Sequence, residues 1–282
     1  MKLVRYGEKG KEKPGLIDGA GALRDLSGLI PDIGGEVLLP EGLASLRALD
    51  ASKLPAVSGK PRLGAPVGGV GKIVAIGLNF SDHAAESNLP VPSEPIVFMK
   101  ATSALSGPDD PVIIPRGSEK TDWEVELAIV IGKPASYVEE KDALSHVAGY
   151  AIMNDVSERA YQIERGGQWD KGKGCDTFAP FGPWLVTSDE IADPQALDMR
   201  LDVNGEVMQR GNTRTMIFPA KHIISYVSQF MSLQPGDVIT TGTPPGVGMG
   251  KKPPRYLKPG DVMSLSIQGL GEQRQKCVAW AR

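Results

Sequence analysis

Acidic and apolar residues alternate in Asp-Trp-Glu-Val-Glu at residues 122–126, immediately before an apolar run at 127–131. Side chains of a β-strand point to opposite faces in turn, so the alternation predicts that Asp122, Glu124 and Glu126 share one face. Like charges on one face repel, and a bound cation relieves that repulsion. Carboxylate oxygens suit hard divalent ions such as Mg²⁺. The same alternation is also typical of a solvated strand face, and the motif alone leaves both interpretations open.

Asp155 is a further candidate ligand, because it follows a predicted apolar strand at residues 150–153. Its surroundings also fit a different role. In Asp-Val-Ser-Glu the spacing is that of a helix capping box, with Asp155 as the N-cap and Glu158 at the third helical position. One carboxylate can cap a helix and bind a metal through different oxygens, so the residues leave both roles open.

His83 and Glu86 are the best candidates for proton transfer, since they lie three residues apart in the chain. On a helical turn this spacing places both side chains on one face. The carboxylate can then orient the imidazole, which removes a proton from water. The alternative is an exposed helical turn with no catalytic role. The other two histidines, His146 and His222, are interpreted as structural.

Two glycine-rich segments also carry polar side chains. Residues 171–174 read Lys-Gly-Lys-Gly, where a lysine can hold a carboxylate or a developing enolate, although a solvated basic loop has the same composition. The neighbouring Cys175 has no evident base and is interpreted as a small core residue. Residues 240–251 superficially resemble a phosphate loop but lack its spacing, and the prolines at 253–254 prevent a helix from starting there. We interpret this segment as a turn whose hydroxyls and amides line a site.

Two parts of the chain must position these residues. Residues 1–65 contain short apolar runs separated by turn signals, with one short predicted helix. Residues 55–69 are rich in Pro and Gly, which is typical of a linker. In residues 66–282 predicted strands outnumber helices, which favours an α+β fold with a mixed, mainly antiparallel sheet system over a doubly wound one. The predicted strands include residues 123–131, 198–203 and 262–267, and the predicted helices include 141–147, 156–164 and 220–231. We therefore expect a small N-terminal domain at 1–65 and a catalytic domain at 66–282.

Composition limits the classes of partner. The chain has 282 residues and a formal net charge of −3, and its basic residues are scattered. Nucleic acids and anionic membrane surfaces need a basic face, so neither is expected as a partner. No apolar run reaches the roughly 18 residues of a membrane span, and the N-terminus lacks the apolar core of a signal peptide. Two cysteines do not make a disulfide framework, so we expect a reducing compartment, the cytoplasm.

Six segments resemble the fumarylacetoacetate hydrolase family, and the likeness extends from about residue 72 to the C-terminus. In order along the chain they are GLNFSDHAAE (77–86), EPIVFMK (94–100), DWEVELAIVIG (122–132), NDVSER (154–159), KGCDTFAPFGP (173–183) and TGTPPGVG (241–248). Residues 1–65 resemble the smaller, variable domain of such proteins. The resemblance implies a mixed, mainly β roll with a small N-terminal α/β domain, usually in a homodimer.

The resemblance also implies a metal site and a pair that activates water. Glu124, Glu126 and Asp155 match the family's ligands for one Mg²⁺ or Mn²⁺ ion. His83 and Glu86 match the water-activating pair. The match adds Asp155 to the metal site and excludes Asp122 from it.

Further residues match the substrate side of the site. Lys173 matches an active-site lysine that stabilises negative charge. Arg159, Gln162 and Thr241 fall at positions that line the substrate site, and Lys100, at the end of the second segment, is assigned to the same group. The small-molecule partner implied by these residues is an oxo acid.

The activity that the resemblance implies is metal-dependent hydrolysis of the C3–C4 bond of a 2,4-dioxo acid, which releases pyruvate and a second acid. Whole-chain likeness favours 2,4-diketo-3-deoxy-L-rhamnonate, from sugar-acid breakdown, as the substrate. Ureidoglycolate cleavage, oxaloacetate decarboxylation and isomerisation are alternatives on the same metal-enolate site. A non-catalytic metal or oxo-acid binding protein is the alternative of another class. His83 and Glu86 argue against it, because metal binding alone does not need them. One departure from the family is Phe80, where many members have Tyr.

Overall fold

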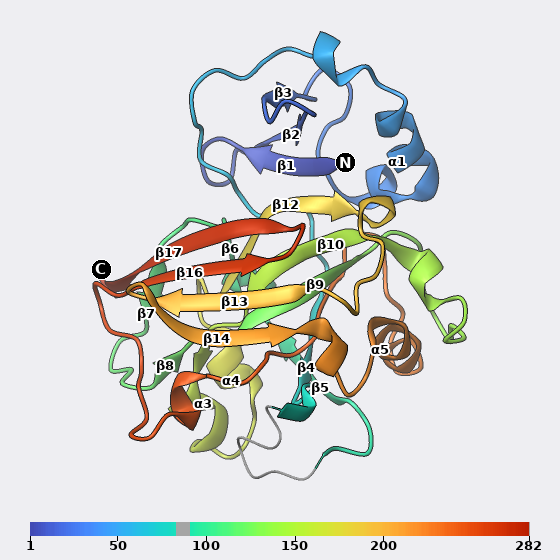
Figure 1. Cartoon of the computed structure of the whole chain (residues 1–282). Helices are drawn as coiled ribbons and strands as arrows, with labels where there is room; N and C mark the ends of the chain where they lie inside the picture. Colours follow the sequence, from blue (N-terminus) through green and yellow to red (C-terminus); the bar gives the residue numbers. More distant parts are fainter. Residues whose placement is uncertain (83–90, 282) are drawn as a thin grey trace.

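The computed structural model describes residues 1–82 and 91–281 of the chain. Figure 1 shows two large β-sheets with short helices around them. Within the described residues the α-helices are α1 (Pro40–Arg47), α3 (Arg159–Ile163), α4 (Asp170–Lys173) and α5 (Ala220–Val227). None of the helices in this part of the chain is long and apolar enough to cross a membrane. The predicted α+β class, with mostly strands and few helices, is confirmed.

The larger sheet has three antiparallel neighbours, β9, β10 and β12, at its centre. Every residue of β9 and β10 is buried, which explains why β9 is almost continuously apolar instead of alternating. In spatial order the sheet runs β3 (Leu23–Asp25), β2 (Lys13–Ile17), β1 (Lys2–Tyr6), β12 (Ala179–Thr187), β10 (Val147–Asn154), β9 (Val125–Ile131), β15 (Val238–Thr240), β4 (Ile73–Gly77), β5 (Ile96–Lys100), and β6 (Leu105–Ser106) pairs with β12.

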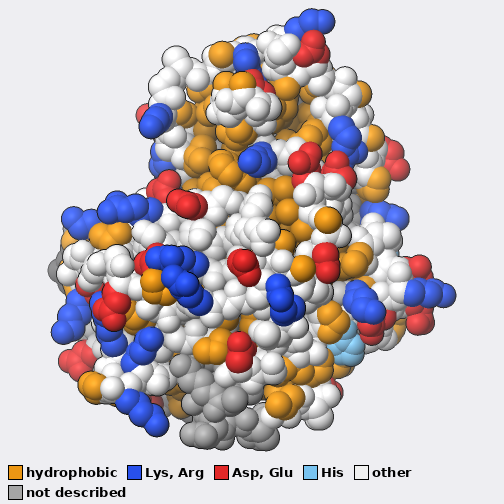
Figure 2. Space-filling model, viewed as in Figure 1, with side chains coloured by type: hydrophobic (Ala, Val, Ile, Leu, Met, Phe, Trp, Pro, Cys, Tyr) orange, Lys and Arg blue, Asp and Glu red, His pale blue; other side chains and the backbone are white. Residues whose placement is uncertain are grey.

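The second sheet packs against the first and lies in front of it in Figure 1. Its order is β14 (Glu206–Asn212), β13 (Asp198–Val203), β16 (Val262–Ile267), β17 (Gly271–Ala279) and β7 (Val112–Ile114). Alternate residues of β13 and β16 are buried, so one face of this sheet joins the core. The other face meets solvent, and Figure 2 shows it covered mainly by polar and charged side chains.

The N-terminal strands extend the larger sheet. β1 pairs antiparallel with β12, and Leu3 lies opposite Leu185. Both leucines are fully buried. The N-terminal segment therefore forms the upper lobe of Figure 1 while sharing a sheet with the rest of the chain. The domain boundary near residue 65 stays a prediction.

The strand predicted over residues 123–131 is interrupted at its start. β8 (Thr121–Asp122) is a separate short strand, and β9 begins only at Val125. Two residues outside any strand separate them. The prediction that Asp122 and Glu126 belong to one continuous strand is therefore wrong.

The helix predicted from residue 156 begins later. Residues Ser157–Glu158 are extended and form β11, which pairs with β8. Helix α3 starts at Arg159 with Glu158 as its N-cap, whose carboxylate accepts a 3.1 Å hydrogen bond from the backbone N–H of Ala160. The capping-box interpretation of Asp155 is wrong, and its carboxylate is free to serve the site.

Other helical predictions also changed in extent. The helix predicted at residues 141–147 is a short 3-10 turn, η4 (Ala143–His146). The helix predicted at 220–231 ends at Val227. Neither element contributes a residue to the carboxylate cluster or to the cavity above it.

Candidate metal centre and active site

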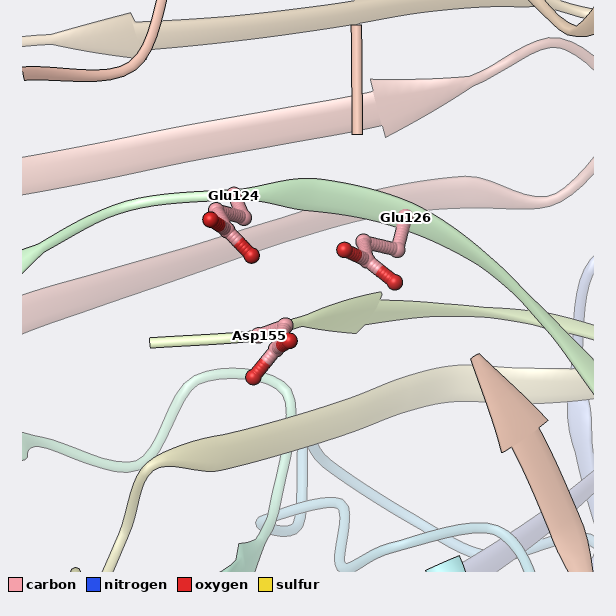
Figure 3. A group of neighbouring side chains, drawn as sticks. All are labelled: Glu124, Glu126 and Asp155. Atoms are coloured by element: carbon pink, nitrogen blue, oxygen red, sulfur yellow. The ribbon is translucent and has the colours of Figure 1, made fainter. Parts of the chain in front are cut away.

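Three buried carboxylates, Glu124, Glu126 and Asp155, converge at one end of the larger sheet. Each offers an oxygen within 4.8 Å of the others. Figure 3 shows the groups turned toward one another: Glu126 lies in β9, Glu124 just before that strand, and Asp155 directly after β10. The antiparallel register produces this meeting, since Met153 lies opposite Glu126. The backbone N–H of Asp155 then donates to the carbonyl of Glu124 at 2.9 Å. The three predicted metal ligands are thus brought together.

Lys173 closes one side of this cluster. It is the last residue of α4, is 2% exposed, and donates 2.7 Å hydrogen bonds to Glu124 Oε2 and Asp155 Oδ2. An ammonium group has three N–H donors. Among the described residues the third has no oxygen acceptor, and Lys173 lines the cavity above the cluster. The predicted active-site lysine therefore has a proton available for a ligand.

Lys100 contacts the carboxylate cluster but does not line the cavity. Its ammonium group donates to Asp155 Oδ1 at 2.6 Å, to the carbonyl of Val156 at 3.3 Å and to the carbonyl of Lys173. These three acceptors use all three of its N–H groups, and its side chain is fully buried. The predicted substrate-binding role of Lys100 is replaced by support of Asp155, because no donor is left for a substrate.

Arg159 and Gln162 do line the cavity, as predicted. The guanidinium donates from Nη2 to Glu124 Oε1 at 2.7 Å, from Nε to Asp122 Oδ2 at 2.8 Å, and from Nη1 to Gln162 Oε1 at 3.1 Å. Asp122 is therefore a partner of Arg159 and not a member of the metal-binding group. Its predicted exclusion from the ligands agrees with this placement.

Thr241 does not face the cavity. Its hydroxyl donates to the carbonyl of Leu127 at 2.9 Å, whereas its neighbours Gly242 and Thr243 line the cavity. The glycine-rich turn thus contributes to the site as expected, but through different residues. Thr240, which the sequence did not single out, donates its hydroxyl to Glu126, and the N–H of Gly242 donates to the same oxygen at 2.8 Å.

The electrostatic surroundings of the two glutamates differ. Burial works to raise the pKa of Glu124, but Lys173 and Arg159 outweigh it and lower that pKa to about 2. Glu126 forms no ion pair with a cationic side chain among the described residues. Burial raises its pKa well above the ordinary value, and the carboxylates of Asp155 and Glu124 raise it further. A proton or a cation is needed beside Glu126.

The charge balance and the ligand type both fit a divalent cation. Four buried carboxylates (Asp122, Glu124, Glu126 and Asp155) face three cations (Lys100, Arg159 and Lys173), which leaves one formal negative charge uncompensated. The candidate ligands are all carboxylate oxygens, the donors that Mg²⁺ and Mn²⁺ accept in proteins. A bound divalent ion would supply the missing positive charge next to Glu126.

A cavity of about 540 Å³ opens above the carboxylates. One apolar wall was not anticipated from the sequence. Trp169 and Phe98 line it with their rings packed edge to face at 5.2 Å between centroids. A Cβ atom on Gly77 would lie 2.5 Å from Cζ3 of Trp169, so the indole occupies the space that a side chain there would fill. Gly77, at the end of β4, indicated that another group could approach the backbone closely at this position. The sequence did not indicate that this group is Trp169.

The water-activating pair predicted from the sequence, His83 and Glu86, lies outside the described residues. The adjacent Phe80 is fully buried. The catalytic role of this pair therefore remains a prediction.

Comparisons with known proteins identify the family of the chain. The sequence pattern of the fumarylacetoacetate (FAA) hydrolase C-terminal domain matches residues 72–278. A protein of Burkholderia multivorans, provisionally named a hydrolase, is 63% identical over 276 residues, which cover 98% of each chain. The solved structure of fumarylacetoacetate hydrolase from the psychrophilic Exiguobacterium antarcticum has a TM-score of 0.86 and 35% identity, with 99% of this chain and 100% of that chain covered.

Another solved relative carries ligands. Maleylpyruvate hydrolase from Sphingobium sp. SYK-6, in complex with manganese(II) ion and pyruvate, has a TM-score of 0.82 and 32% identity, with 100% of both chains covered. Other solved structures of similar identity are named as isomerases. Because the family pattern covers most of the chain and the relatives cover nearly all of it, the chain belongs to the fumarylacetoacetate hydrolase family.

Proposed function

We propose that the protein is a divalent-metal-dependent hydrolase that cleaves the C3–C4 bond of a 2,4-dioxo acid and releases pyruvate and a second acid. The observation that carries this proposal is the buried carboxylate cluster, which opens onto a cavity and holds an uncompensated charge at Glu126. The relative solved with manganese and pyruvate supports the same classes of cofactor and product.

Glu124, Glu126 and Asp155 would hold the ion, Mg²⁺ or Mn²⁺. When bound, such an ion supplies Lewis acidity to the 2-oxo group of the substrate. Lys100 keeps Asp155 in place from below through its 2.6 Å hydrogen bond. The ligand Asp155 is therefore held in place before the ion binds. Three protein ligands would leave coordination positions of the ion open for the substrate.

Lys173 stabilises the negative charge that develops when the bond breaks. Two of its N–H groups hold Glu124 and Asp155, and the remaining one is available on the cavity side. A preorganised ammonium in a buried site stabilises a developing oxyanion more than it would in water. Arg159, held by its own carboxylate partners, adds a fixed positive charge to the same wall.

Hydrolysis needs an activated water, and His83, oriented by Glu86, would supply it. His83 removes a proton from water, and the resulting hydroxide adds to the C4 carbonyl. The C3–C4 bond then breaks, and its electron pair moves to the pyruvate fragment as an enolate. The protonated His83 returns its proton to C3, which gives pyruvate, and the C4 fragment leaves as the second acid.

For the substrate we propose 2,4-diketo-3-deoxy-L-rhamnonate, on the basis of whole-chain likeness. A cavity of about 540 Å³ has the size of sites that enclose small organic acids. We further propose that the protein is a homodimer and that it acts in the cytoplasm, in the breakdown of sugar acids.

The test is a panel of 2,4-dioxo acids mixed with purified protein and Mn²⁺ or Mg²⁺, followed by loss of enol absorbance and by detection of pyruvate with NMR. Pyruvate and a second acid in equal amounts support the proposal. Glu124→Gln should abolish turnover, whereas the matched control Glu139→Gln, at an exposed position, should leave it unchanged.

The rival functions give different products in the same assay. Carbon dioxide without a second acid indicates a decarboxylase, and a rearranged acid without pyruvate indicates an isomerase. Glyoxylate and urea from ureidoglycolate indicate the lyase. No turnover on any substrate favours a non-catalytic binding protein.

A further inference from the structure

Asp122 is a fully buried carboxylate that has no place among the proposed metal ligands. Its Oδ1 accepts hydrogen bonds from the backbone N–H groups of Trp123 at 2.8 Å and Gly248 at 2.7 Å. Its Oδ2 accepts from the N–H of Met249 at 3.0 Å and from Nε of Arg159 at 2.8 Å. Four donors from two directions fill the acceptor sites of this carboxylate.

Two of the backbone donors, Gly248 and Met249, belong to the segment 246–252, which forms one wall of the cavity. Val247, Met249, Gly250, Lys251 and Lys252 of this segment line the cavity, and Gly248 begins its 3-10 turn. The indole N–H of Trp123 donates to the carbonyl of Gly246 at 3.1 Å and fixes the same segment. A Cβ atom on Gly248 would lie 2.7 Å from Asp122 Oδ1, so this approach requires glycine. Asp122 and Trp123 together hold the wall.

The other donor leads to the metal site. Arg159 lies between Asp122 and Glu124, with Nη2 2.7 Å from Glu124 Oε1. Among the described residues these are its only two carboxylate partners. When Asp122 is replaced by a neutral residue, Glu124 is the only carboxylate partner left for the guanidinium. The guanidinium then competes with a metal cation for the oxygens of Glu124.

We infer that Asp122 is a positioning residue, which ties the cavity wall at 246–252 to the metal-binding carboxylate Glu124 through Arg159. The inference rests on the proposed metal site, but its tests need no turnover. Substitution of Asp122 by a residue with fewer acceptors loosens the wall and weakens cation binding together.

The decisive variant is Asp122→Asn in the full-length protein. Asn has one acceptor oxygen in place of two and cannot accept from all four donors, so amide hydrogen exchange in residues 246–252 should accelerate at least tenfold. The dissociation constant for Mn²⁺, measured by titration without substrate, should rise about tenfold.

Asp237→Asn is the matched control. Asp237 is 1% exposed, accepts backbone hydrogen bonds from Lys72 at 2.9 Å and Gln234 at 2.7 Å, and forms an ion pair with Lys72. It therefore repeats the chemistry of Asp122 outside the cavity. This control should change neither measurement by more than twofold. If Asp122→Asn behaves in both measurements as the control does, the inference is overturned.

A double variant separates positioning from simple charge loss. In an Arg159→Gln background, Asp122→Asn should change Mn²⁺ affinity less than twofold, because no guanidinium is left to redirect. A tenfold effect that persists in this background would be a direct charge effect and would contradict the inference.

Arg159→Gln alone keeps the inference testable if Asp122→Asn does not fold. Removing the competing guanidinium should tighten Mn²⁺ binding at least threefold, and unchanged or weaker binding overturns the inference. Failure of the wild-type protein to bind Mn²⁺ would instead count against the proposed function, while the exchange measurement still tests the cavity wall.

Discussion

Glu124 and Glu126 lie two residues apart and are both buried, yet their pKa values shift in opposite directions. Burial raises both pKa values. At Glu124 the positive charges of Lys173 and Arg159 outweigh burial, and the pKa falls to about 2. At Glu126 the carboxylates of Asp155 and Glu124 add to burial, so this group keeps its proton to higher pH until a cation replaces it.

Cation affinity should therefore depend on pH through Glu126. Since an ion must displace the Glu126 proton, apparent Mn²⁺ affinity should fall about tenfold per pH unit below the raised pKa of this group. Titrations of Mn²⁺ across a pH series check this expectation. A flat profile from pH 5 to 8 would contradict it.

Glu126→Gln should stabilise the metal-free protein and remove metal binding. The raised pKa means that the folded state holds this proton more tightly than the unfolded chain does. The resulting stability is fully present below the ordinary pKa and is lost as pH rises through the folded-state pKa. Glutamine keeps the neutral form at every pH, so the free energy of unfolding should exceed the wild-type value at alkaline pH, and the difference should shrink as pH falls. Urea denaturation without metal measures it, and a destabilised variant would disprove the assignment.

Lys100→Met should destabilise the fold, because Lys100 holds Asp155 from below and has no N–H left for a substrate. Removing one partner of a buried ion pair typically costs about 3–5 kcal/mol, and we expect a loss near the lower end since Lys173 still pairs with Asp155. Urea denaturation checks the value, with the exposed Lys60→Met as control. Normal stability with a raised KM would instead favour substrate binding.

Gly77→Ala should disturb the apolar wall of the cavity. The new methyl group would lie 2.5 Å from the ring of Trp169, so the indole must move away from Phe98. We expect KM to rise roughly tenfold, about 1.4 kcal/mol of substrate binding, with a change in tryptophan fluorescence. Gly28→Ala is the control, because a Cβ atom there meets nothing within 4 Å. Equal behaviour of the two variants would show that the indole has no part in binding.

His83→Ala tests the predicted water-activating pair. Proton transfer by a positioned base contributes about 10²–10⁴-fold, so kcat should fall by that amount. Mn²⁺ affinity should stay near the wild-type value, since His83 is not among the proposed ligands. His146→Ala, at a histidine whose ring contacts the carbonyl of Lys133, is the control. An unchanged kcat would remove His83 and Glu86 from the mechanism.

Local sequence patterns were sufficient for much of the fold and for part of the site. The strands predicted at residues 198–203 and 262–267 match β13 and β16, because alternation and turn signals are encoded within each segment. The apolar run after Glu126 predicted a buried strand for the same reason. Alternation also placed Glu124 beside Glu126, while family likeness was needed to add Asp155 as the third ligand.

Only the tertiary structure decided which charges meet. Lys100 and Asp155 are 55 residues apart, and Asp122 contacts the N–H of Gly248 from 126 residues away. Periodicity within a segment says which way a side chain points, but not which distant group faces it. The partners depend on strand register and on the break between β8 and β9, which places Asp122 in a separate strand from Glu126. The residue types for a metal site were thus readable from the sequence, whereas their division into ligands, supports and positioning groups required the folded chain.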